Sequence, residues 1–388
     1  MSRGPRPSAW GAAREGAQLG VLLGALFVAR LDAQAPPPDA VPAATTAKAI
    51  AKPDTADSRL GPPLFAPGLT YAPETGFAVG LGILALTQER QPFQRPDTYA
   101  ANVLVTQRGQ FTLAATSDIW TRRNRLRVES DLAAIRFPNR FFGLGLDTPS
   151  SGERYTPTTI AGAVLVQRAV RPCVYLGVRV AGDRTRLSDL DSAGRITGYR
   201  ERDGWSLISI GTQVSWDTRD RIFTARRGML HTLSVARTDR ALGATFDATR
   251  VSLDLRTYQP VHPRATIAVQ GRLDHVAGAL PFDRLPQLGG ANFLRGYFAG
   301  RFRDRSLGLA QAEVRLGPWW DHLGVTLFAA TGGVAPGLDA LREVRFRRAA
   351  GAGIRLFADP RSGLSLRIDW ARGELGSRGW YFTVGEAF

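Results

Sequence analysis

The chain has few of the residue types on which most catalytic sites and small scaffolds depend. It contains one cysteine, four histidines and, at Lys48 and Lys52, its only lysines. The lone Cys173 excludes an intramolecular disulfide framework. The histidines are His231, His262, His275 and His322. They form no HExxH motif and no cluster with a cysteine, so the sequence predicts no metal site and no cofactor.

Long hydrophobic runs are also scarce. Beyond the N-terminal region no stretch reaches the roughly 18 apolar residues of a membrane-spanning helix, which excludes a helical membrane protein. The one apolar run near the start, Leu19–Ala29, follows several arginines and precedes Ala33-Gln34-Ala35. A basic stretch, a short apolar core and a small-x-small site are typical of a cleaved secretory signal, which we predict over residues 1–35.

Two further segments follow the predicted signal peptide. Residues 36–62 are rich in proline, alanine and threonine without periodicity, which predicts a disordered periplasmic linker. The remaining residues, 63–388, form the folded domain. The chain carries a net charge of +16, which favours an anionic partner such as outer-membrane lipid or lipopolysaccharide. We expect no nucleic-acid partner, because the arginines are scattered and no recognised nucleic-acid module is present.

Apolar and polar residues alternate along most of the folded domain. In the segment 205–217, Ile208, Ile210, Val214 and Trp216 share one face, and the opposite face is polar. The segments 246–258, 265–274 and 362–371 alternate in the same way and carry charges on the polar face. A soluble sandwich is the alternative, but the strands are long and nearly all share this pattern. Since an exported membrane protein without helical spans must be a closed barrel, we expect apolar side chains to face lipid and polar ones the lumen.

The turn signals divide the domain into sixteen segments, an even number as in single-chain bacterial barrels. The predicted fold is therefore all-β, a transmembrane antiparallel barrel of about sixteen strands. The predicted strands lie near 64–72, 76–88, 96–107, 109–120, 123–136, 155–169, 171–183, 204–217, 228–238, 243–259, 263–277, 306–317, 322–333, 347–358, 362–373 and 379–388.

The longest connection, Leu285–Asp304, separates the eleventh and twelfth predicted strands. It contains paired glycines, an Arg-Gly-Tyr core and further basic residues. Long connections with such content are usually functional. We expect this one to fold back into the lumen, where Arg295 needs a carboxylate partner.

The C-terminal segment, Trp380–Phe388, ends the chain on an aromatic residue. Continued alternation would place Trp380, Phe382, Val384 and Phe388 on one face, so Phe388 is expected to face lipid. Outer-membrane barrels commonly close with such a strand, which the assembly machinery reads as a signal.

Four motifs resemble one known family. LRGY (294–297) is similar to the motif at the tip of the lumenal loop of the BamA/TamA superfamily, outer-membrane assembly factors and two-partner-secretion translocators of the bacterial surface antigen type. FFGLGLDT (141–148), SWDTRDRIFTARRGMLH (215–231) and the ending YFTVGEAF are also similar to family motifs. In the third, the hairpin positions are Asp217, Arg219, Asp220 and Gly228.

The resemblance implies a sixteen-stranded barrel with a long lumenal loop between strands eleven and twelve. Arg295, Gly296 and Tyr297 take the positions of the loop motif, whose arginine packs in the family against acidic residues of the inner wall. Glu313 and Asp369 are the candidate partners, because alternation directs both inward. The alternative is a solvated loop arginine.

Two departures from the family limit what the resemblance implies. Ala330 stands where the family has an aspartate on the thirteenth strand, so the arginine must be anchored elsewhere. The periplasmic POTRA domains that receive clients are not expected either, since residues 36–62 leave no room for them. This predicts a short, POTRA-less member.

Taken with the motifs, the sequence predicts an outer-membrane assembly, insertion or translocation factor that acts at a seam between the first and last strands. The expected partners are unfolded outer-membrane or secreted clients and the assembly machinery for its own insertion. A plugged outer-membrane pore is the alternative. An enzyme is not expected: His231 near Asp217 and His275 beside Asp274 are the only candidate pairs, and both fit ordinary surface or lumenal histidines.

Overall fold

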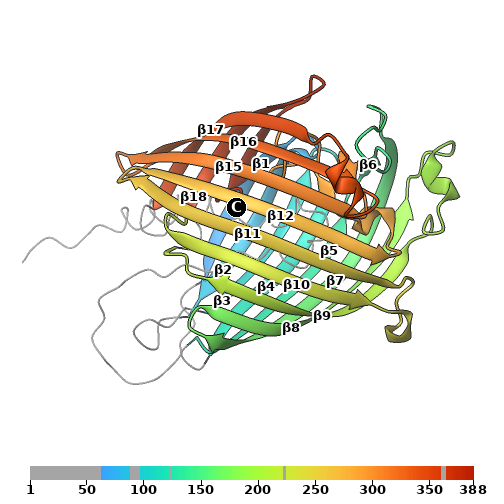
Figure 1. The fold of residues 1–388 in the computed structure, drawn as a ribbon, viewed down its shortest axis with the longest axis horizontal. Helices are drawn as coiled ribbons and strands as arrows, with labels where there is room; N and C mark the ends of the chain where they lie inside the picture. The colour runs from blue at the N-terminus through green and yellow to red at the C-terminus, as the bar shows by residue number, and fades with distance from the viewer. Residues whose placement is uncertain (1–62, 88–96, 122–123, 222–223, 360–363) are drawn as a thin grey trace, which may run out of the picture.

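The computed structural model describes residues 63–87, 97–121, 124–221, 224–359 and 364–388. The signal peptide predicted over residues 1–35 and the linker predicted over 36–62 lie outside these ranges. Within them, none of the helices is long and apolar enough to cross a bilayer. The described residues form a closed antiparallel β-barrel with strongly tilted strands (Figure 1).

Sixteen strands make up the wall, each hydrogen-bonded to its neighbours along the chain, with β1 and β19 closing the ring. They are β1 Leu64–Ala72, β2 Gly76–Leu86, β3 Thr98–Thr106, β4 Phe111–Thr121, β5 Leu126–Arg136, β7 Glu153–Arg171, β8 Val174–Ser188, β9 Trp205–Asp217, β10 Gly228–Thr238, β11 Ala248–His262, β12 Ala265–Gly278, β15 Ser306–Trp319, β16 Leu323–Ala335, β17 Arg347–Asp359, β18 Leu364–Gly373 and β19 Arg378–Val384. The predicted number and order of strands are confirmed.

Three short strands and four 3-10 helices are not among the sixteen wall strands, although β6 pairs with the end of β7. They are β6 Asn139–Phe141, β13 Gln287–Leu288, β14 Phe302–Arg303, η1 Arg195–Gly198, η2 Arg240–Leu242, η3 Phe282–Arg284 and η4 Ala340–Arg342. All lie in connections at one end of the barrel, the right-hand end in Figure 1. Several connections at the other end are very short, as at residues 172–173 and 263–264, although residues 218–221 and 224–227 between β9 and β10 also lie there. In outer-membrane barrels the long loops are extracellular and the short turns periplasmic.

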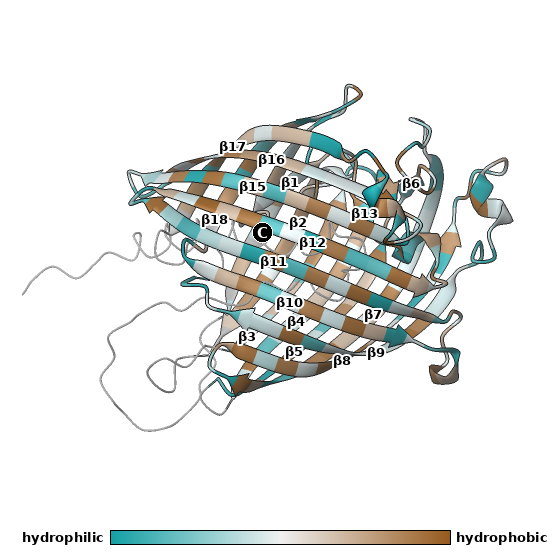
Figure 2. Cartoon of the chain, viewed as in Figure 1, coloured by the Kyte–Doolittle hydropathy of each residue, from teal (hydrophilic) through white to brown (hydrophobic). Residues whose placement is uncertain are grey.

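The strands alternate as the sequence predicts. On β9, Ile210, Val214 and Trp216 are exposed on the outer wall, whereas Gln213 and Asp217 are buried on the lumenal side. Figure 2 shows the same alternation of hydrophobic and hydrophilic bands along neighbouring strands. The antiparallel sheet pairs backbone groups within the wall, and the alternation presents apolar side chains outward, as a lipid environment requires.

The C-terminal tail differs from the prediction. β19 ends at Val384, and the positive φ of Gly385 (75°) turns the last residues inward. The Phe388 ring is 7% exposed and packs against Tyr258 inside the barrel, and Arg315 donates a hydrogen bond of 2.8 Å to the Phe388 carbonyl oxygen. The prediction that Phe388 faces lipid is therefore wrong, because the strand alternation does not continue past Gly385.

Candidate functional site

The long connection between β12 and β15, residues 279–305, lies inside the barrel and is held there by apolar packing. Its residues Leu288, Leu294, Tyr297 and Phe302 are each at most 2% exposed. They form one cluster with inward-facing residues of the wall, namely Leu307, Leu309, Val334 and Ala349. A fully buried large apolar side chain contributes about 1.5–3 kcal/mol. The loop is therefore part of the core of this protein.

Arg295, in the loop, is 1% exposed and meets two carboxylates of the wall. Its guanidinium lies 2.5 Å from Asp369 on β18 and also forms an ion pair with Glu313 on β15. The guanidinium carbon lies 3.4 Å from the ring centre of Phe328 on β16, a cation–π contact. The structure thus brings together the three residues named from the sequence, Arg295, Glu313 and Asp369, on three different elements.

Other arginines of the wall share these carboxylates. Arg355 lies 2.7 Å from Asp369, and Arg315 lies 2.8 Å from Glu313. A buried charge is costly unless it is paired and hydrogen-bonded. Because both carboxylates keep a second guanidinium, removal of Arg295 would remove one anchor of the loop without leaving either carboxylate unpaired.

Gly296 and Tyr297 press the loop tip against β18. Gly296 has φ of 105°, and a Cβ there would lie 2.9 Å from the backbone nitrogen of Gly373. The Tyr297 hydroxyl donates to the Arg348 carbonyl oxygen (3.0 Å) and accepts from the Glu374 N–H (2.7 Å). Burial raises the pKa of Tyr297, so its hydroxyl stays protonated and able to donate.

Ala330, at the position of the expected aspartate, is partly buried against the apolar cluster around the loop. Phe328, two residues earlier on β16, supplies the contact to Arg295 instead. The anchoring charge therefore comes from β15 and β18.

A second polar anchor of the loop was not predicted. The Tyr155 hydroxyl on β7 donates to an Asp283 carboxylate oxygen at 2.5 Å, and Arg303 lies 3.5 Å from the same carboxylate. Arg284 pairs with Asp283 (2.9 Å) and with Asp183 of β8 (3.1 Å). The only signal in the sequence was the set of charged residues near both ends of the loop. Because a loop has no strand alternation, the sequence could not predict which way these side chains point.

The four named positions of the family hairpin motif make local contacts between β9 and β10. Arg219 makes two hydrogen bonds to Asp217, of 2.9 and 3.0 Å. The Asp220 carboxylate accepts from the backbone N–H of Arg226 at 3.0 Å. Gly228 has φ of 99°, and a Cβ there would lie 2.2 Å from the Thr218 carbonyl oxygen. These contacts explain the residue types at all four predicted positions.

The seam between β1 and β19 has the fewest paired residues of any two neighbouring strands of the described wall. The two strands share the single register pair Tyr71–Phe382, whose rings meet edge-on with centres 5.7 Å apart. By contrast, β18 and β19 pair from Leu366–Val384 to Arg372–Arg378. On the lumenal side, Ala291 of the loop packs with Ala72 of β1 and Tyr381 of β19.

In each histidine–aspartate pair considered from the sequence, the two side chains lie on opposite faces of the barrel wall. His231 lies against Trp216 on the outer side, with ring centres 6.1 Å apart, whereas Asp217 is buried on the lumenal side. Asp274 and His275 are consecutive on β12, so their side chains point to opposite faces. Among the described residues no group of three or more His, Cys, Asp and Glu side chains could hold a metal ion.

Comparisons with known proteins agree with this architecture. The Omp85 superfamily domain matches residues 95–388, and no curated protein matches the chain. Among solved structures, the chain is similar to BamA from Haemophilus ducreyi lacking POTRA domains 1-3, with 13% identity and a TM-score of 0.59 over 84% of this chain and 70% of that one.

Two further similar structures are both CdiB. The one from Acinetobacter baumannii has 12% identity and a TM-score of 0.55 over 83% of this chain and 59% of that one. The one from Escherichia coli has 13% identity and a TM-score of 0.55 over 82% and 62%. The chain thus spans less than two thirds of either CdiB, and at these identities the likeness shows the fold alone. Because the family domain covers most of the described barrel, the chain belongs to the Omp85 superfamily.

Proposed function

We propose that this barrel is an outer-membrane protein insertion or translocation factor that works at the seam between β1 and β19. The observation that carries the proposal is the single register pair Tyr71–Phe382 at that seam. An unpaired strand edge is a template for pairing with another chain. Separation of this pair frees two edges at which a client strand can add before it enters the membrane.

The lumenal loop supports this mechanism, because it touches both seam strands from inside. Ala291 belongs to one buried cluster with Ala72 of β1 and Tyr381 of β19. The Tyr381 hydroxyl also accepts a hydrogen bond of 2.9 Å from the Gly296 N–H. In our proposal the ion pairs of Arg295 hold the loop tip in place, and the loop in turn sets how readily the seam opens.

Location and partners follow from the same proposal. Family membership and an outward apolar wall support the bacterial outer membrane as the location. The clients would be unfolded outer-membrane or secreted proteins, and the outer-membrane assembly machinery would insert this barrel itself. In that step Phe388 would be read before the tail folds into the lumen.

The experiment that tests the proposal is a reversible seam lock. Tyr71→Cys and Phe382→Cys, in a Cys173→Ser background, place two thiols at directly paired positions. Paired Cα atoms are about 4.5–5.5 Å apart, within the range of a disulfide. The protein is folded into liposomes, and the folding rate of a urea-unfolded barrel client is followed before and after reduction.

We expect oxidation of the two seam cysteines to slow client folding at least tenfold, which removes the acceleration. Reduction should restore the faster rate. The matched control is Val164→Cys with Val180→Cys, an outward-facing pair on β7 and β8 that should leave the rate unchanged whether oxidised or reduced. Client acceleration that survives oxidation of the seam would rule out this mechanism.

A plugged transport pore is the second candidate. The observation in its favour is that residues 279–305 fill part of the lumen and are held by several polar anchors, among them Arg295 and Asp283. In a plugged pore, Arg295→Ala raises ion conductance across a planar bilayer, and neither this change nor the seam lock affects client folding.

A further inference from the structure

Three arginines face outward at the long-loop end of neighbouring strands. They are Arg348 on β17, Arg372 on β18 and Arg378 on β19, and all three side chains are exposed. Arg372 and Arg378 are direct cross-strand partners. Like charges placed directly opposite each other destabilise a sheet. None of the three guanidiniums forms an ion pair with a carboxylate of the described residues, and the nearby Glu374 pairs with Arg347 instead.

The arginines lie where lipid headgroups are expected. Trp370 and Trp380, also direct partners, stand two residues further along the same strands toward the barrel middle. They are 39% and 52% exposed on the outer wall. Tryptophan side chains gather at membrane interfaces, so this pair indicates the interface on the long-loop side. Arg372 and Arg378 therefore lie at the level of the outer-leaflet headgroups.

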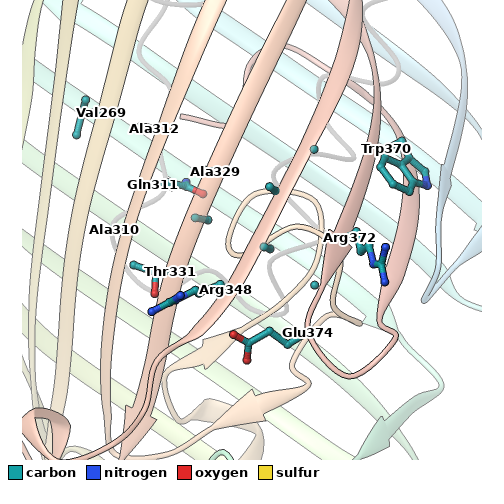
Figure 3. Close-up of a pocket in the computed structure, with 15 residues that line it drawn as sticks. Val269, Ala310, Gln311, Ala312, Ala329, Thr331, Arg348, Trp370, Arg372 and Glu374 are labelled. Carbon is teal, nitrogen blue, oxygen red and sulfur yellow. The ribbon is translucent and has the colours of Figure 1, made fainter.

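A groove runs below these arginines on the outer wall. It has a volume of about 820 Å³ and crosses β12, β15, β16, β17 and β18. Outward-facing residues of its floor and rim include Ala310, Ala312, Ala329 and Ala350, with Thr331, Trp370, Arg348 and Arg372 beside them. Figure 3 shows the small side chains along neighbouring strands, with Trp370, Arg348 and Arg372 around them.

The groove opens to the outside and not to the lumen. On the lumenal side, a Cβ at Gly373 would meet the Tyr297 ring at 2.5 Å, and a Cβ at Gly351 would meet the Phe328 ring at 2.5 Å. The inner side of this wall is therefore filled by the loop and by Phe328. On the outer side, the alanines leave a depression where neighbouring positions carry larger residues such as Leu327 and Ile354.

We propose that this groove binds a phosphorylated glycolipid of the outer leaflet, the lipid A part of lipopolysaccharide. An acyl chain lies along the alanine floor beside Trp370, and a phosphate is held among Arg348, Arg372 and Arg378. Guanidinium groups bind phosphate through paired, charge-assisted hydrogen bonds. An anion at this position also relieves the repulsion between Arg372 and Arg378. The assignment of leaflet rests on the outer-membrane location proposed above.

Other outward arginines provide a matched comparison. Arg184 and Arg186 on β8 are exposed near the same end of the barrel. Arg184 is paired with Ile160 of β7, a large side chain that is 70% exposed. These two arginines offer the same charge beside a large exposed side chain instead of an alanine floor.

The test measures binding of fluorescent lipid A to the purified barrel in detergent. Four proteins are compared: the unchanged chain, Arg372→Gln with Arg378→Gln, Ala329→Trp, and Arg184→Gln with Arg186→Gln. Ala329→Trp fills the groove without changing a charge and, since Ala329 is exposed on the outer wall, leaves the core intact. Heat-modifiable migration on a gel verifies that each variant is folded.

We expect Kd for lipid A to rise roughly tenfold or more in the first arginine variant, because it loses charge-assisted hydrogen bonds. Ala329→Trp should weaken binding to a similar extent, and the β8 variant should bind as the unchanged chain does. Equal weakening in both arginine variants, with Ala329→Trp unaffected, would mean general charge attraction and overturn the site. Equal binding of phosphatidylglycerol would overturn the glycolipid assignment. Neither result depends on whether the seam inserts clients.

Discussion

The extent of strand pairing differs between the seam and the side of the barrel formed by β7 and β8. β7 and β8 have 19 and 15 residues and pair from Thr156–Ser188 to Arg171–Val174. At the seam, β1 has 9 residues and β19 has 7, and one pair joins them. Both regions belong to the same closed sheet. What closes the seam is consequently an aromatic contact outside and the loop inside, rather than a ladder of backbone hydrogen bonds.

The largest expected difference between the two regions is in hydrogen exchange. Each backbone hydrogen bond contributes about 1 kcal/mol net, and exchange follows the free energy of local opening. The facing amides of β1 and β19 should therefore exchange on the order of 100-fold faster than those between β7 and β8. Mass spectrometry of peptides after timed deuteration measures this. Equal protection in both regions would contradict the comparison.

Arg295→Ala should separate stability from seam function. Breaking a buried ion pair costs about 3–5 kcal/mol, and we expect the lower end because Arg315 and Arg355 remain beside the carboxylates. Loss of the loop anchor should also slow client folding. Unfolding temperature and the liposome assay measure the two effects.

The matched variant is Arg127→Ala, on β5. Arg127 is also buried and lies 2.9 Å from Asp118 and 2.5 Å from Glu129. We expect a comparable fall in stability with an unchanged client rate, because both carboxylate partners of Arg127 belong to the wall strands β4 and β5 and not to the loop. If both variants slow client folding equally, the loop anchor has no special role.

Gly296→Ala tests the close approach of the loop to β18. The positive φ of Gly296 and the 2.9 Å approach of a Cβ to Gly373 should cost about 1–3 kcal/mol. Gly271→Ala on β12 is the control, because a Cβ there has nothing within 4 Å and the change should stay within about 0.5 kcal/mol. Chemical denaturation of both variants gives the difference, and an equal loss would remove the case for tight packing at the loop tip.

The contrast also explains what the sequence could predict. Strand alternation determines which face a residue occupies, so Glu313 and Asp369 could be directed into the lumen and the strands placed within a few residues. Alternation has no equivalent in a loop, which is why the anchor formed by Asp283, Arg303 and Tyr155 was missed. It also failed at Phe388, because Gly385 ends the extended conformation before the tail.

The smallest expected effect concerns the hydroxyl that joins the loop to the seam. Tyr381 of β19 accepts from the Gly296 N–H at 2.9 Å and donates to the Tyr297 carbonyl oxygen at 3.1 Å. Tyr381→Phe should cost about 1 kcal/mol and should speed exchange of the facing seam amides. Hydrogen exchange and denaturation measure the two changes.

Tyr155→Phe makes the same chemical change on the other side of the barrel. The Tyr155 hydroxyl donates to the Asp283 carboxylate at 2.5 Å, and loss of a hydrogen bond to a charged group costs about 1.5–3 kcal/mol. This variant should be the less stable of the two, yet its seam amides should exchange as in the unchanged chain. If it speeds seam exchange as much as Tyr381→Phe does, then global stability, and not the contact between loop and seam, controls opening of β1 from β19.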